Sequence, residues 1–75
     1  TFKYNLERRS DIDIFVYDNN GKEIKHLSMK NVSKGNNSIF WDGRNENGNK
    51  ISTGVYFYSF KTNYNSISNK MIFIK

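Results

Sequence analysis

The alternation of apolar and polar residues over short segments constrains this chain more than any other feature of its sequence. The alternation is clear over residues 2–6 and 12–17, where at least every second side chain is apolar. A period of two is typical of β-strands that bury one face. No segment carries an apolar repeat at helical spacing over a useful length. The sequence therefore predicts an all-β fold.

Turn-forming residues separate the alternating segments at short intervals. Asn20-Gly21 predicts a two-residue hairpin turn, because both positions tolerate positive φ. Gly43 and Gly48 mark further turns. The strands that we expect between these turns cover residues 2–6, 12–17, 22–28, 39–41, 51–52, 55–62 and 67–75. About seven short strands at this spacing predict an antiparallel β-sandwich.

Three local details accompany this prediction. Ile24 and Leu27 lie three residues apart, which breaks the alternation and predicts a β-bulge. Residues 29–35 are expected to form a loop that ends at Gly35. Trp41 is expected at the end of a strand with its ring buried in the core.

The length of the chain limits how it can be stabilised. Its 75 residues are enough for one domain, which we expect to cover residues 1–75, and the chain contains no cysteine. A domain of this size buries only about 60% of its unfolded surface. Its twelve aromatic residues and eight isoleucines must supply the stability, at roughly 1.5–3 kcal/mol for each large apolar side chain that is fully buried.

The chain begins at Thr1, and we expect it to be part of a longer protein. No apolar run approaches the roughly 20 residues of a membrane span, so stable membrane insertion is not expected. The net charge is +5, but the lysines are scattered singly along the chain. Because no basic patch or run is present, nucleic acid is not an expected partner.

Few residues could carry chemistry. Asp42 to Gly48 places oxygen-bearing side chains at alternate positions, as a calcium loop can. The terminal glutamate of such loops is missing, and Asp and Asn also stabilise turns. A turn is therefore the preferred interpretation, and neither a metal site nor a cofactor is predicted.

The titratable side chains also have plainer interpretations than catalysis. His26 has no second histidine or cysteine to complete a metal site. Asp11 and Asp13 share a strand face, where solvated charge is the expected state. Arg8 and Arg9 occupy a turn and are expected to be solvated. We predict no catalytic residue, so the chain is not expected to be an enzyme.

The aromatic residues near the C-terminus form a further group. Tyr56, Tyr58 and Phe60 fall on one face of a strand, and Val55 and Phe57 fall on the other. A strand that is apolar on both faces is expected at the centre of a sheet. Such an aromatic strip can stack on sugars, but a core this small needs these rings, and core is the preferred interpretation.

Several sequence blocks occur together in a recognisable order. They are Val-Tyr-Asp at 16–18, Gly-Lys-Glu at 21–23, Trp-Asp-Gly-Arg at 41–44, Ser-Thr-Gly-Val-Tyr-Phe-Tyr at 52–58 and Lys-Met-Ile-Phe-Ile-Lys at 70–75. With this order and spacing, the chain resembles the type A C-terminal sorting domain of the bacterial type IX secretion system. It also resembles the related Ig-like domain of the flagellar hook-capping protein.

The resemblance implies an Ig-like sandwich at the end of a larger exported protein. A sorting domain would be read by the outer-membrane secretion machinery and would direct its cargo to the cell surface. The resemblance therefore implies partners in that machinery and in the upstream domains, and we expect the isolated domain to be a monomer. Two alternatives stay open: a structural Ig-like module of a flagellar-hook-cap-like assembly, and an accessory carbohydrate-binding module of a secreted hydrolase.

The same resemblance directs attention to two strands near the C-terminus. A strand at a chain end can expose backbone groups that a partner extends by adding a strand of its own. The residues that we expect to bind a partner are Gly54, Val55, Tyr56, Lys70, Met71, Ile72, Phe73, Ile74 and Lys75.

Overall fold

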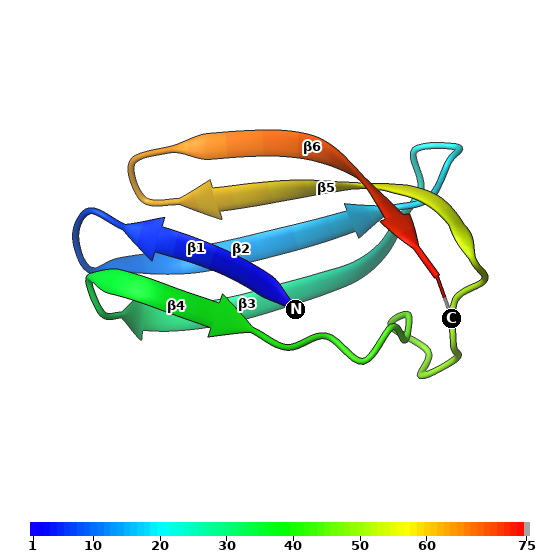
Figure 1. Cartoon of the computed structure of the whole chain (residues 1–75), viewed down its shortest axis with the longest axis horizontal. Helices are drawn as coiled ribbons and strands as arrows, with labels where there is room; N and C mark the ends of the chain where they lie inside the picture. The colour runs from blue at the N-terminus through cyan, green and yellow to red at the C-terminus, as the bar shows by residue number, and fades with distance from the viewer. Residues whose placement is uncertain (75) are drawn as a thin grey trace.

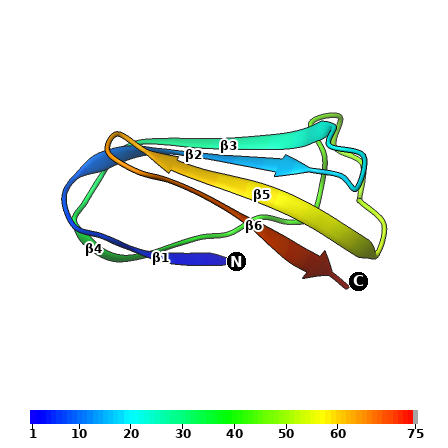
Figure 2. The same cartoon turned by 90° about the horizontal axis from the view of Figure 1, so that it is seen from above.

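The computed structural model describes residues 1–74, which fold into two facing antiparallel sheets (Figures 1 and 2). In these residues the strands are β1 (Phe2–Leu6), β2 (Ser10–Tyr17), β3 (Glu23–Val32), β4 (Gly35–Ile39), β5 (Gly54–Thr62) and β6 (Ser66–Phe73). β1 and β4 form a two-stranded sheet, and the larger sheet has the order β3-β2-β5-β6. The predicted all-β, Ig-like sandwich is therefore confirmed. Residues 1–74 contain no helix long and apolar enough to cross a membrane.

The core forms where alternate residues of β2 meet the smaller sheet. Ile12, Ile14 and Val16 are completely buried, because β2 pairs with β3 on one side and with β5 on the other. Leu6 of β1 and Ile39 of β4 cover them from the opposite layer and belong to the same cluster. Each such side chain contributes roughly 1.5–3 kcal/mol. The apolar residues of the alternating pattern therefore form the inner face of this sandwich.

The count of about seven strands was wrong, because the segment 51–52 does not form one. In the described residues there are six strands. Ile51 is buried in the core, but its N–H donates to the carbonyl of Gly43 at 3.0 Å and not to a neighbouring strand. Lys50 makes one isolated bridge with Arg44. The tight turns before Ile51 leave too few extended residues for a ladder.

β3 is longer than the sequence indicated. Residues 29–32 were expected in a loop, but they continue β3, where Met29 and Val32 pair with β2. The pairing shifts register between Val16 and Tyr17, which confirms the bulge expected near Ile24. A second register shift follows Ser10, and Asn31 of β3 has a φ of 53°. The bulges keep apolar residues facing the core where the alternation fails.

The β2–β3 hairpin lies where Asn20-Gly21 predicted it, but its loop covers residues 18–22 and is longer than two residues. Gly21 has a φ of 82°, a left-handed conformation that favours glycine. The Asp18 carboxylate accepts bonds from the N–H groups of Asn20 and Lys22, both at 2.9 Å. This side chain therefore adds to the backbone bonds of the turn, in which the N–H of Asp18 donates to the carbonyl of Lys22 at 2.9 Å.

Trp41 lies beyond the end of β4 and is half-buried. The expectation that it ends a strand with its ring buried in the core was therefore wrong. Its indole N–H donates to the carbonyl of Arg44 at 2.9 Å, which keeps one edge of the ring near the surface. The ring contacts Phe2 and Phe73, with centroid distances of 6.4 and 5.9 Å. Trp41 thus joins the first strand to the last.

Gly43 lies directly beneath the ring of Phe73. Its φ is 75°, and a Cβ placed on it would come within 2.7 Å of the Phe73 ring. Gly48, in the same loop, has a φ of 82° but open space around it. Only Gly43 therefore combines the backbone requirement with close packing.

We expect Gly43→Ala to lower the free energy of unfolding more than Gly48→Ala. Both changes carry a left-handed backbone cost of roughly 1–2 kcal/mol. Gly43→Ala adds an overlap with Phe73, which should cost about 1–3 kcal/mol more. Urea unfolding of the two variants measures the difference, and equal losses would contradict the packing of β6 against this loop.

Candidate functional site

The β5–β6 hairpin brings together most of the residues predicted to bind a partner. Val55 pairs with Ile72 across the hairpin, and Phe57 follows two residues later on the same face. Their exposed fractions are 40%, 67% and 41%, respectively. We call Val55, Phe57 and Ile72 the outer apolar patch. Phe57 was absent from the predicted set of partner-binding residues, although the period of two had already placed it on the same strand face as Val55.

Other predicted residues point the opposite way. Met71 and Phe73 pack against the core cluster, as expected from their shared face. Tyr56 is buried, and its hydroxyl donates to the carbonyl of Ser52 at 2.7 Å. Gly54 pairs with Phe73 across the hairpin. These four residues hold the hairpin in place and contribute no side chain to the outer apolar patch.

The remaining predicted residues lie along the strand that ends the chain. Lys70 and Ile74 are exposed, and Lys75 lies outside the described residues. β6 pairs with β5 on one side and is the last strand of its sheet. Its other edge therefore carries backbone groups free to bond to a partner strand.

A polar cluster occupies the same outer face at the β2–β3 pair. The Nε2 of His26 lies 2.8 Å from Oδ1 of Asp13, and its ring stacks on Phe15 at 4.2 Å between centroids. The Nζ of Lys61 lies 5.2 Å from the centre of the Phe15 ring. The hydrogen bond from His26 holds the pKa of Asp13 below its ordinary value.

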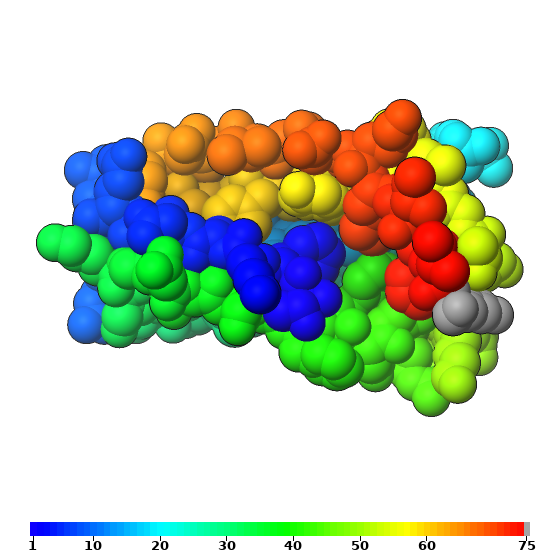
Figure 3. Space-filling model, viewed as in Figure 1, coloured from blue at the N-terminus to red at the C-terminus, as the bar shows by residue number. Residues whose placement is uncertain are grey.

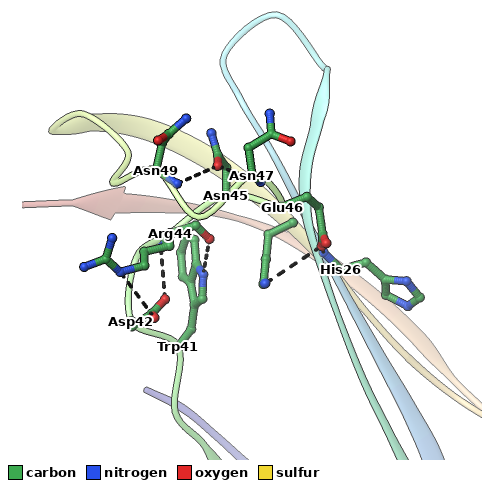
Figure 4. A network of polar contacts seen from close by, with 9 residues as sticks. His26, Trp41, Asp42, Arg44, Asn45, Glu46, Asn47 and Asn49 are labelled. Atoms are coloured by element: carbon green, nitrogen blue, oxygen red, sulfur yellow. Dashed lines mark hydrogen bonds and ion pairs between the residues drawn. The ribbon is translucent and has the colours of Figure 1, made fainter.

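The loop that was weighed as a calcium site forms turns, as predicted (Figure 4). Oδ1 of Asp42 accepts the N–H of Arg44 at 3.1 Å. Oδ1 of Asn45 accepts the N–H groups of Asn47 and Asn49, both at 3.0 Å. These oxygens satisfy the backbone of the loop. In residues 1–74 no three His, Cys, Asp or Glu side chains are grouped as metal ligands.

Glu46 fastens this loop to the edge of β3. Its N–H donates to the carbonyl of Ile24 at 3.0 Å, and its carboxylate accepts the N–H of His26 at 2.7 Å. Lys25 lies 4.0 Å from the same carboxylate. Glu46 therefore occupies edge groups of β3 that an added strand would otherwise use. On β6 no distant loop does this in the described residues, and the N–H groups of Ser66 and Lys70 donate only to the side chains of the preceding Asn65 and Asn69, at 2.8 and 3.0 Å.

Comparison with known proteins now identifies the family. The sequence model described as "FlgD Ig-like domain" matches residues 1–66. The chain belongs to the FlgD Ig-like domain family. This FlgD Ig-like domain is similar to the basal-body rod modification protein FlgD of Buchnera aphidicola subsp. Acyrthosiphon pisum (strain APS), with 29% identity over 51 residues. That region covers 68% of the chain and 22% of the relative.

No solved structure matches this chain significantly. The relation to the flagellar Ig-like domain, expected from the sequence, is confirmed. The assignment to type IX sorting domains stays a prediction. The family match stops at residue 66, so nearly all of β6 lies outside the matched region.

The pair formed by Asp13 and His26 makes the stability of this FlgD Ig-like domain depend on pH. Because folding lowers the pKa of Asp13, the contribution is present above the ordinary pKa of about 3.9 and is lost as pH falls through the folded value. Both side chains are partly exposed, so we expect about 1 kcal/mol or less.

Asp13→Asn should therefore bring the stability at pH 6 closer to that at pH 3. His26→Phe, which keeps a ring against Phe15, should have a similar effect if the hydrogen bond is the cause. Urea midpoints measured across this range give the comparison. An unchanged pH dependence in both variants would contradict the assignment.

Proposed function

We propose that this chain is a non-catalytic, structural Ig-like module that joins a larger protein to its neighbours in a FlgD-type assembly. The family match over residues 1–66 carries this proposal. The polar clusters support it, because Asp18, Asp42, Asn45 and Glu46 accept hydrogen bonds that hold turns and a strand edge. We propose an external location, on a surface structure of the cell, because the relative is named a basal-body rod modification protein.

The outer apolar patch is the contact surface in this proposal. Val55, Phe57 and Ile72 expose apolar side chains on a face that Lys70 borders through its pairing with Phe57. Aromatic residues in the centre of an interface contribute most to binding. We therefore assign the central contact to Phe57 and place the other domains of the parent protein or the neighbouring subunits against it.

A chimera tests this function directly. The Ig-like segment of FlgD in a motile host is replaced by this chain, and hooks are counted by electron microscopy together with swimming. We expect hooks to form, and Phe57→Ser with Ile72→Ser to reduce their number. Ser68→Ala, also on an exposed position of β6, is the matched control.

Thermal unfolding of each purified variant separates loss of contact from loss of fold. A chimera that accumulates in folded form without supporting any hooks would overturn the structural assignment. Equal hook numbers for the double variant and for Ser68→Ala would overturn the role of the patch while leaving the module itself intact.

Type IX sorting is the second candidate. It is favoured by the block at residues 70–75, which lies outside the region matched by the FlgD family and falls mostly on the edge strand β6. Lys70, Ile72 and Ile74 are exposed there. In this candidate, the secretion machinery adds a strand to β6 and reads its exposed side chains.

A fused reporter in a type IX-competent host tests sorting. Lys70→Glu with Lys75→Glu is the test variant, and at the exposed Lys70 a surface substitution usually changes stability by about 0.5 kcal/mol or less. The candidate predicts that the wild-type fusion reaches the cell surface and the double variant stays in the periplasm. Retention of the wild-type fusion inside the cell would eliminate sorting.

A further inference from the structure

The two sheets of the sandwich differ in width. β1 is paired with β4 on one side and has a free edge on the other. The four-stranded sheet extends beyond this edge, so the inner face of β6 has no strand opposite it (Figure 1). Ile67 faces inward by its register with Phe60, yet it is 53% exposed. The smaller sheet therefore lacks a strand at this position.

A groove occupies the missing position. Its volume is about 600 Å³, within the range of roughly 300–1,000 Å³ typical of binding sites. Figure 3 shows it as a hollow between β1 and β6, with β5 at its floor. Its apolar lining includes Tyr4, Tyr58, Phe60, Ile67 and Met71. The groove is on the inner side of β6 and is distinct from the outer apolar patch.

The shape and chemistry of the groove favour an extended polypeptide. The free edge of β1 carries backbone donors and acceptors along its length, which a neighbouring strand satisfies best. Paired strands lie about 4.8 Å apart, so one added strand would enter the hollow beside β1. Its alternate side chains would then point toward the apolar lining.

The charged side chains at the rim of the groove favour one kind of incoming polypeptide segment. Lys3, Lys70 and Glu7 line the groove, so the charged side chains of its lining carry a net charge of +1, and neither lysine makes an ion pair within residues 1–74. The chain has a net charge of +5. A second copy would bring more lysines to this rim, where like charges on adjacent strands are destabilising. Acidic residues on the incoming segment complement the rim.

We propose that the groove binds an extended segment of a separate partner protein, which adds to the free edge of β1 as a third strand. Apolar residues at alternate positions of the segment cover Ile67 and Met71. Acidic residues at the intervening positions lie beside Lys3, the next residue before Tyr4 on β1. The proposal does not depend on the outer apolar patch or on the FlgD-type assembly.

The probe is a short synthetic peptide in which valine alternates with glutamate and threonine. It is titrated into the isotope-labelled 75-residue chain and followed by NMR. We expect chemical-shift changes at β1 and at Ile67 and Met71, with slowed hydrogen exchange of β1 amides. The same peptide with alternate amides N-methylated cannot pair with an edge and is the matched control.

Two variants locate the binding site without disturbing the core. Ile67→Ser removes an exposed apolar contact and should weaken binding roughly tenfold. Lys3→Glu should weaken binding of the acidic peptide by roughly fivefold and strengthen binding of a version with lysine in place of glutamate. Ser68→Ala, beyond the groove lining, should change neither.

Several outcomes would overturn the proposal. Equal binding of the N-methylated peptide would exclude strand addition. Shift changes confined to Val55, Phe57 and Ile72 would assign the peptide to the outer patch. A concentration-dependent dimer that excludes the peptide would show that a second copy fills the groove. Loss of peptide binding when residues of the parent protein are restored next to the chain would show that the parent fills it.

Discussion

The fold depends on β2, the strand whose three alternate aliphatic residues are completely buried. Ile12, Ile14 and Val16 contact the smaller sheet, while their backbone pairs with β3 and β5. Because the chain has no cysteine, this row and the aromatic rings around it must supply most of the stability. A slip of one residue would turn the whole row to solvent, so the row also fixes the register of both neighbours.

The aromatic side chains extend this core to the ends of the chain. Phe2 contacts Trp41 and Tyr58, and Phe73 contacts Trp41 and Tyr56. First and last strands are thereby fixed to one loop, and Gly43 is the position that lets the Phe73 ring approach it. These contacts fix the position of β6, so that one apolar face of the strand points inward and the other points outward.

The outer edges of the two sheets differ in whether another segment covers their backbone groups. Glu46 bonds to the backbone of β3 at the bulge residue Ile24 and at His26, two residues further on. β1 and β6, on the other side of the sandwich, have free edges with a groove between them. An open edge is a hazard in a solitary domain. In the proposed joining role, the same open edge would be a means of binding, and both proposed contact surfaces lie on this half of the molecule.

The alternating pattern was sufficient to predict the sandwich, the bulge near Ile24 and the two faces of β5, because a period of two reports which side of a strand is buried. The hairpin near Gly21 was predicted from its turn residues, because Asn20-Gly21 tolerates positive φ. The alternating pattern also indicated that Met71 and Phe73 face inward. It misjudged residues 29–32 and Ile51, whose state depends on pairing partners distant in sequence. The contact residues implied by the family resemblance included Tyr56 and left out Phe57, because neither the resemblance nor the local pattern shows what covers each face of a strand. The tertiary structure alone decided that Glu46 closes one edge, that β1 leaves another open and that a groove lies beside it, because these features arise where separate strands meet.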